Sequence, residues 1–307
     1  MLLVHAHPDD ETLATGGTIA RYAALGVSVT VVTCTLGEEG EIIPPALARL
    51  RAAEADQLGG YRVGELRAAC AALGVTEHRF LGGIGRWRDS GMVGTDANAH
   101  PRALVAGDLA EQVDALAEIL DEVRPQVVIS YGPDGGYGHP DHIRAHRITV
   151  DAARENPDVA RVFYAVDARA DIERGRVELS TVDGLPYTVP APGQLPAVAD
   201  DVITTRVDIA AHVDAKLAAM RAHATQISVW TDGERRAYAL SNGIGRPVLD
   251  VECYTLASGE PAGADADLFG GLSTGVGLST GAAPTDSRGA GRPVEREAGR
   301  PVERVSR

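Results

Sequence analysis

The chain has 307 residues, of which 44% are hydrophobic, 23% charged and 4% aromatic, a composition typical of a folded protein with an aliphatic core. Its 29 basic and 43 acidic side chains give a formal net charge of −14 at pH 7. This negative charge argues against binding to nucleic acid or to an anionic membrane surface, because both need clustered cations. No apolar stretch approaches the roughly 18 residues that a transmembrane helix needs.

Short apolar segments alternate with helical segments in the first half of the chain. The sequence predicts strands at residues 2–5, 27–35, 78–81, 127–130 and 161–166. It predicts helices at residues 11–25, 46–58, 64–73, 108–123 and 141–153. This alternation indicates an α/β fold with a Rossmann-like, doubly wound and mostly parallel sheet.

The second half of the chain is less regular. We predict a catalytic domain at residues 1–166 and a smaller C-terminal lobe at residues 167–257, with a strand at 202–209 and a helix at 211–224. Beyond these, Gly, Ala, Ser, Thr and Pro dominate and short units repeat. Such a composition predicts a disordered tail at residues 258–307.

The cysteines and the N-terminus bear on the cellular compartment. The three cysteines are far apart in the sequence and suggest neither a disulfide framework nor a metal-binding pair. The opening segment MLLVHAHPDD lacks the basic leader and apolar stretch of a secretory signal. We therefore expect a cytoplasmic protein.

Two segments rich in histidine and aspartate each follow a predicted strand. HAHPDDE occupies residues 5–11, after the first strand, and GGYGHPDH occupies residues 135–142, after the strand at 127–130. The carboxyl ends of parallel strands are where open α/β sheets bind ligands. Two imidazoles and one carboxylate around an open position suit a catalytic Zn²⁺ or Fe²⁺ site. We predict His7, Asp10 and His142 as the three metal ligands.

Each segment alone also has a simpler explanation. Asp9 or Asp10 can cap the helix that follows, with the neighbouring histidine at the surface. The presence of both segments at strand ends of one sheet favours the metal site. A second carboxylate, Asp9, stands next to Asp10 and can accept a proton from the attacking water.

The motifs AHPDDE (6–11) and GHPDH (138–142) resemble those of the PIG-L or LmbE-like superfamily of metal-dependent deacetylases. Further stretches resemble the branch that deacetylates N-acetylglucosaminyl-inositol in mycothiol biosynthesis, over most of residues 1–257. These stretches are TCTLGEEGE (33–41), DQLGGYRVGEL (56–66), LGGIGRWRDSGM (81–92), GPDGGYGHPDH (132–142) and HATQ (223–226).

The resemblance implies hydrolysis of an N-acetyl group with release of acetate. It implies one Zn²⁺ per subunit, or Fe²⁺, bound by the three ligands predicted above. It also assigns catalytic roles: Asp9 as general base, His139 as the group that stabilises the oxyanion or protonates the leaving amine, and Tyr137 as the group that polarises the amide carbonyl. Asp141 is expected to orient His139 and to favour its protonated form.

The resemblance further implies a small-molecule amino-sugar inositol as the substrate. Arg62 and Asp89 are expected to contact its hydroxyl groups, with Glu41 close by. Two alternatives remain open at this point. One is a mycothiol S-conjugate amidase that uses the same metal site, and the other is a non-catalytic carbohydrate-binding protein with a structural metal.

Overall fold

The computed structural model describes residues 1–272, which belong to one compact unit. Its main sheet has seven strands in the order β3-β2-β1-β4-β5-β10-β6. Their bounds are β1 (Leu2–His5), β2 (Thr30–Thr33), β3 (Glu77–Phe80), β4 (Val127–Ser130), β5 (Arg161–Val166), β6 (Thr205–Asp208) and β10 (Val251–Gly259). Neighbouring strands from β3 to β5 are parallel, whereas β10 is antiparallel to both β5 and β6. The predicted α/β fold with a mostly parallel sheet is confirmed.

The central strands are buried on both faces, which explains their nearly continuous apolar sequences. Every residue of β1, β2 and β4 is buried. Successive side chains point to opposite faces of the sheet. Leu3 and Ile129 therefore belong to one hydrophobic core, whereas Leu2 and Val128 belong to a second core on the other face.

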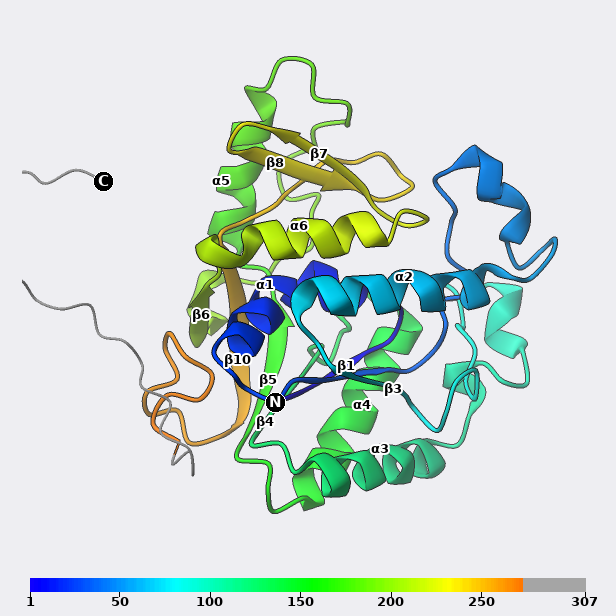
Figure 1. Cartoon of the computed structure of the whole chain (residues 1–307), viewed down its shortest axis with the longest axis vertical. Helices are drawn as coiled ribbons and strands as arrows, with labels where there is room; N and C mark the ends of the chain where they lie inside the picture. The colour runs from blue at the N-terminus through cyan, green and yellow to red at the C-terminus, as the bar shows by residue number, and fades with distance from the viewer. Residues whose placement is uncertain (273–307) are drawn as a thin grey trace, which may run out of the picture. The chain divides into compact units, whose positions relative to one another are not determined.

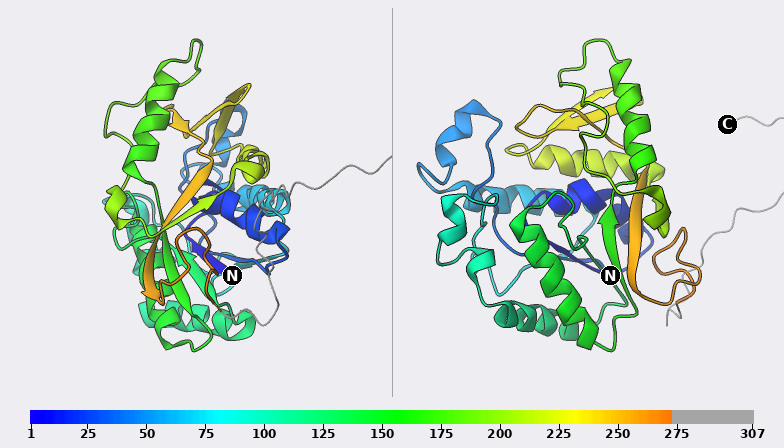
Figure 2. Two further views of the ribbon diagram at one scale, coloured as in Figure 1. Left: turned by 90° about the vertical axis from the view of Figure 1, so that its left-hand side faces the viewer. Right: turned by 180° about the vertical axis from the view of Figure 1, so that it is seen from behind.

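Helices cover both faces of the sheet (Figures 1 and 2). Helices α1 (Asp10–Ala24), α2 (Leu58–Leu73) and α6 (Val213–Ala222) pack against one another on one face. Helices α3 (Leu109–Val123) and α4 (Pro140–Glu155) pack together on the other. None of the helices in the described part of the chain is long and apolar enough to cross a membrane.

The second half of the chain contributes to two structures. Strands β6 and β10, both within or overlapping the predicted smaller lobe, complete the main sheet. Helix α5 (Arg169–Ser180) lies beside a separate three-stranded sheet formed by β7 (Ser228–Asp232), β8 (Arg235–Ala239) and β9 (Arg246–Pro247) (Figure 1). The predicted helix at 46–58 is wrong, because only a short 3-10 helix, Pro45–Leu50, forms there before a series of turns.

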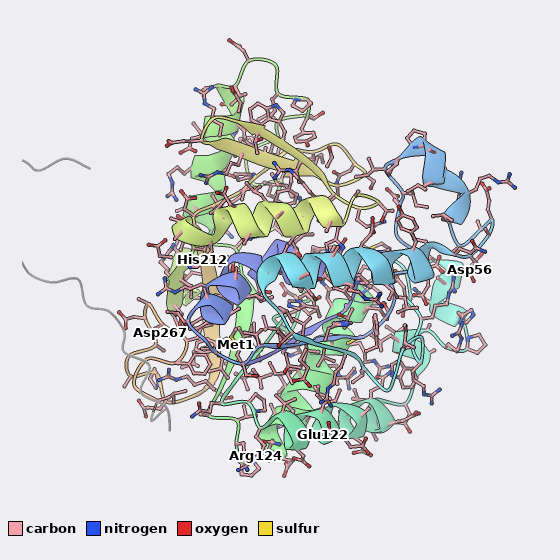
Figure 3. The ribbon with its side chains drawn as sticks, viewed as in Figure 1. Met1, Asp56, Glu122, Arg124, His212 and Asp267 are labelled. Carbon is pink, nitrogen blue, oxygen red and sulfur yellow. The ribbon has the colours of Figure 1, made fainter. Side chains whose placement is uncertain are left out.

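Residues 258–272 pack against the sheet. Leu268 is fully buried, and the Arg161 guanidinium donates hydrogen bonds to its backbone carbonyl and to those of Glu260 and Ala262. Asp267, labelled in Figure 3, accepts a hydrogen bond of 2.6 Å from the Tyr22 hydroxyl. The prediction of disorder is therefore wrong for residues 258–272, while residues 273–307 lie outside the part of the chain that the structure describes.

Candidate functional site

The order of the strands brings the two histidine-rich segments together. Strand β1 lies between β2 and β4, so the chain winds in opposite directions on the two sides of β1. The loops after β1 and β4 therefore diverge at the same edge of the sheet and leave a crevice between them. Asp9 immediately precedes α1, and His139 immediately precedes α4. Both segments enter the crevice just before a helix begins.

The Asp10 carboxylate lies between two imidazoles that come from the two loops. Its Oδ2 atom is 3.3 Å from His7 Nδ1 and 3.4 Å from His142 Nε2. Burial alone would raise the pKa of Asp10, but His142 and His7 outweigh it and hold this pKa well below its usual value. Burial likewise disfavours the charged form of His7, but Asp89, Asp10 and Asp141 raise its pKa well above the usual value. The three predicted ligands therefore form one buried cluster.

The remaining nitrogen of each imidazole has its own partner. His7 Nε2 lies 3.3 Å from Asp141 Oδ2 and 3.5 Å from Asp89 Oδ1, and His142 Nδ1 lies 3.1 Å from the carbonyl oxygen of Gly135. Histidines that bind metals usually donate their other N–H group to a carboxylate or a backbone carbonyl. This arrangement leaves His7 Nδ1 and His142 Nε2 directed at Asp10. The ligand atoms of His7, His139 and His142 lie within 4.8 Å of one another, so this cluster of donors fits a divalent cation.

Tyr131 supports the cluster and was missed by the sequence analysis. Its hydroxyl donates a hydrogen bond of 2.8 Å to Asp10 Oδ2, and its ring stacks on His142 with centroids 4.1 Å apart. Tyr131 is the first residue after β4. Its place at the carboxyl end of a central strand was the signal that could have identified it.

Asp9 is held in an unusual backbone conformation beside the cluster. Its φ of 124° is one that residues other than glycine rarely adopt, and its N–H group donates a hydrogen bond of 2.9 Å to Glu11 Oε2. The other Glu11 oxygen lies 2.7 Å from Nε2 of the fully buried His223. Sequence analysis missed this pair, because the two residues are 212 positions apart.

The Asp9 carboxylate has the properties of a proton acceptor. Its Oδ2 atom lies 3.1 Å from Arg62 Nη2. Burial, with a further contribution from Asp10 and against the effect of Arg62, raises the pKa of Asp9 to about 6. A carboxylate with a pKa close to neutrality is well suited to take a proton from water.

His139 and Asp141 differ from the prediction. The Asp141 carboxylate contacts His7 and accepts a hydrogen bond of 2.9 Å from the backbone N–H of Ser90. Asp141 contacts His139 only through its backbone N–H group, which donates a hydrogen bond of 3.2 Å to His139 Nδ1. Burial, His7 and His142 lower the pKa of His139 to about 3. The expectation that the Asp141 carboxylate favours a protonated His139 is therefore wrong, because this carboxylate faces the other histidine.

Tyr137 stands at the mouth of the site. Its side chain is exposed, and its hydroxyl lies 3.5 Å from His142 Nε2. Gly136 and Gly138 on either side of it both have positive φ values. These glycines allow the loop to turn sharply and present the tyrosine to the cleft.

The three predicted substrate-binding residues all line one cleft of about 770 Å³, together with the cluster. Arg62 is buried, and it donates hydrogen bonds to the carbonyl oxygens of Gly37 and Pro8. Asp89 accepts a hydrogen bond of 2.8 Å from the N–H of Gly91. Arg62 and Asp89 are thus fixed by the backbone next to the cluster, whereas Glu41 lies exposed farther out.

Together, these features define the class of the protein. It is a doubly wound α/β protein with a cluster of imidazoles and carboxylates, suited to a divalent cation, in a cleft at the switch point of its sheet. The family model described as "PIG-L: GlcNAc-PI de-N-acetylase" matches residues 2–153. The chain belongs to the PIG-L family.

Curated relatives resemble the chain over most of its length. A protein of Actinosynnema mirum named "1D-myo-inositol 2-acetamido-2-deoxy-alpha-D-glucopyranoside deacetylase" is 66% identical, and the match covers 89% of this chain and 96% of the relative. A protein of the same name from Mycobacteroides abscessus is 51% identical, with 89% and 98% covered. The crystal structure of GalB, a hydratase of Pseudomonas putida, matches with a TM-score of 0.53 at 19% identity, covering 84% of this chain and 96% of that one. That last likeness concerns the fold alone.

Proposed function

We propose that this protein hydrolyses the N-acetyl group of 1D-myo-inositol 2-acetamido-2-deoxy-α-D-glucopyranoside and releases acetate, the reaction of mycothiol biosynthesis. The observation that carries the proposal is the Asp10 carboxylate between two imidazoles, with the Asp9 carboxylate, which pairs with Arg62, beside it in the cleft. The 66% identity to a relative named for this activity supports the choice of substrate.

In this proposal, His7, Asp10 and His142 hold one Zn²⁺ or Fe²⁺ per subunit. Their contacts with Asp141, Tyr131 and the Gly135 carbonyl fix the donor atoms in place. When bound, such a cation lowers the pKa of water to about 7 and polarises the amide carbonyl.

Asp9 is the general base of the proposed reaction. It takes a proton from the attacking water, whose oxygen adds to the carbonyl carbon of the acetamide. Its neighbour Asp10 is engaged with two imidazoles and with Tyr131, so the two adjacent carboxylates have separate tasks. Arg62 holds the Asp9 carboxylate at 3.1 Å and stabilises its charged form.

His139 is the hydrogen-bond donor of the proposed reaction. Its Nδ1 atom accepts the N–H of Asp141, so in the neutral ring Nε2 carries the hydrogen. That group donates to the oxygen on which negative charge develops, and the Tyr137 hydroxyl is a second donor at the same cleft. When the carbon–nitrogen bond breaks, the leaving amine takes up the proton that Asp9 received from water, and acetate leaves.

Arg62, Asp89 and Glu41 supply donors and acceptors for sugar hydroxyls. Because Arg62 and Asp89 lie against Asp9 and His7, we place the acetamido sugar next to them. Glu41 lies farther out, and its carboxylate accepts a hydrogen bond from Ser241. The net charge of −14 suits an uncharged small molecule better than a polyanion such as nucleic acid.

The test combines acetate release with metal analysis on purified protein. We expect the wild type to contain one zinc or iron per chain and to release acetate from the inositol glycoside. Asp9→Asn should lower the rate by at least about 100-fold while the metal stays bound. Asp214→Asn is the matched control, because this aspartate is exposed on α6, outside the cleft.

Three results would change the assignment. Unaltered activity of Asp9→Asn would show that another group is the base. A large preference for a mycothiol conjugate over the inositol glycoside would make the protein an amidase. Absence of acetate release from the wild type with zinc or iron restored would leave only a binding role.

A further inference from the structure

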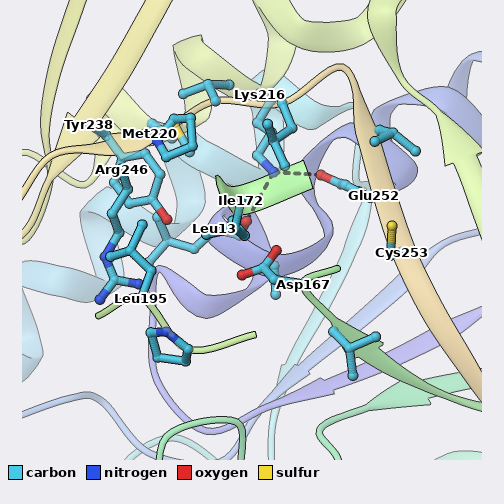
Figure 4. Close-up of a pocket in the computed structure, with 17 residues that line it drawn as sticks. Leu13, Asp167, Ile172, Leu195, Lys216, Met220, Tyr238, Arg246, Glu252 and Cys253 are labelled. Carbon is cyan, nitrogen blue, oxygen red and sulfur yellow. Dashed lines mark hydrogen bonds and ion pairs between the residues drawn. The ribbon is translucent and has the colours of Figure 1, made fainter. Parts of the chain in front are cut away.

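A small chamber of about 40 Å³ adjoins the main cleft (Figure 4). Both cavities are bordered by Asp167, Tyr238 and Arg246, and by Leu13 of α1. None of the functions assigned above uses the chamber. Figure 4 shows the Asp167 carboxylate among the lining side chains, with Leu13 and Lys216 nearby.

The chamber lies at the ligand-binding edge of the sheet. Asp167 is the first residue after β5, and β5 pairs in parallel with β4. It therefore follows the carboxyl end of a strand, as the two cluster loops do. Leu13 lies three residues after Asp10 on α1, about 4.5 Å farther along the helix axis.

The two charged groups shared by the cavities are not neutralised by each other. Within residues 1–272, Asp167 is exposed and forms no ion pair within 4.0 Å, whereas the half-buried Arg246 side chain hydrogen-bonds Tyr238 and leaves its Nε without a partner. Lys216 is itself engaged, since it contacts Glu252 at 2.6 Å and donates to the Leu13 carbonyl.

Other carboxylates that line the cleft have partners within the protein. Glu39 pairs with Arg88, Glu41 accepts from Ser241, and Asp134 accepts the N–H of Gly136. Asp167 is different, because its carboxylate is exposed at the cleft and forms no ion pair within residues 1–272. An exposed carboxylate and a half-buried guanidinium on the same cleft offer acceptors and donors to a ligand bound there.

We propose that Asp167 and Arg246 form a second subsite that binds adjacent hydroxyl groups of the polyol ring of the substrate. A carboxylate accepts hydrogen bonds from hydroxyls, and a guanidinium donates to them. The chamber has room for about three water-sized groups, at 10–15 Å³ each, which accommodates hydroxyls at one edge of a ring but not the ring itself. The assignment of the ring to inositol rests on the proposed function.

The test compares two substrates that share the acetamido sugar. One is the inositol glycoside, and the other is methyl 2-acetamido-2-deoxy-α-D-glucopyranoside, in which a methyl group replaces inositol. Asp167→Asn and Arg246→Gln should each raise KM for the inositol glycoside about tenfold or more, with kcat changed little. Both variants should stay within twofold of the wild type on the methyl glycoside. Asp183→Asn and Arg235→Gln, at exposed positions outside both cavities, are the matched controls.

Two results would overturn the subsite. If the variants lose activity equally on both substrates, the residues support the fold instead of recognising the ring. If neither substrate is affected, the hydroxyls bind elsewhere, while the deacetylase proposal stands. Calorimetric binding of both glycosides in an Asp9→Asn background separates the two proposals. The subsite predicts tighter binding of the inositol glycoside than of the methyl glycoside, and loss of this difference in both variants, even if no acetate is released.

Discussion

Lys216 offers a direct test of how α1, the helix that begins at Asp10, is held in place. It is the only lysine in the chain, and its Nζ atom lies 2.6 Å from Glu252 Oε1 and 3.0 Å from the carbonyl oxygen of Leu13. Both side chains of this ion pair are buried. The pair links α6 to β10 and to α1, the helix that begins at Asp10. Lys216→Met removes the charge but keeps an aliphatic side chain of similar length.

The size of the effect follows from what remains around Glu252. Removing one partner of a buried ion pair typically costs about 3–5 kcal/mol, because the other charge is left uncompensated. Glu252 still accepts the N–H groups of Gly17 at 2.9 Å and Thr18 at 2.8 Å. We therefore expect the lower end of this range, about 3 kcal/mol. For a protein of this size, that corresponds to a fall in melting temperature of roughly 6–12 °C.

Differential scanning calorimetry of four proteins measures the interaction: the wild type, Lys216→Met, Glu252→Gln and the double variant. The double-mutant cycle isolates the coupling between the two side chains, which should exceed about 1 kcal/mol. The exposed substitution Arg221→Met, on the same helix, controls for loss of a surface charge. A fall in melting temperature of less than about 2 °C for Lys216→Met would refute the reasoning. It would mean that removing Lys216 does not leave an uncompensated charge on Glu252.

Three further predictions concern the metal, the C-terminal segment and pH. Adding zinc or iron should raise the melting temperature of wild-type protein that a chelator has freed of metal, because binding to the native state stabilises it. The same addition should not raise the melting temperature of His142→Ala, and an equal rise in both proteins would exclude His142 as a metal ligand. A chain ending at Ser258 should melt several degrees below one ending at Leu272, by circular dichroism, and equal melting would contradict the packing of residues 259–272. Burial alone would raise the pKa of Asp171, but Arg206 outweighs it and lowers this pKa. The charged carboxylate therefore stabilises the fold at pH values above its unfolded pKa of about 3.9. This stabilisation is lost as the pH falls through the lower pKa of the folded state. The difference in melting temperature between the wild type and Asp171→Asn should therefore shrink as pH falls from about 5 to below 3, and a constant difference would count against this ion pair.

The central part of the fold was predictable because local sequence and burial agree there. The strand predicted at 127–130 coincides with β4, whose four residues are all buried in a parallel sheet. Strand β10 was not predicted. It pairs with β5 and β6, which lie far away in the sequence, so no local pattern reveals its place. The expected helix at 46–58 fails for a related reason, since no residue of the short helix Pro45–Leu50 is buried and helix propensity alone rarely stabilises so short a segment.

The residues of the site were predictable, but the directions in which some of their side chains point were not. His7, Asp10 and His142 follow two neighbouring strands, so topology alone brings them together. Successive residues of a helix differ in direction by about 100°. Asp141 and His142, both in the first turn of α4, therefore point differently, and the Asp141 carboxylate reaches His7 rather than His139. This distinction appears only once the helix start at Pro140 is known.

In the two proposals, the residues of the reaction and those of the second subsite come from different parts of the chain. The family model matches residues 2–153, which contain the predicted metal ligands and the proposed base and donors. Asp167 and Arg246 lie beyond it, at the end of β5 and in the small sheet, yet both border the same cleft. A reaction centre and a separate subsite can change independently, because substitutions at well-separated sites act almost additively. If the second subsite is correct, exchange of its two charged groups should alter which amide substrate is preferred without altering how the amide bond is broken.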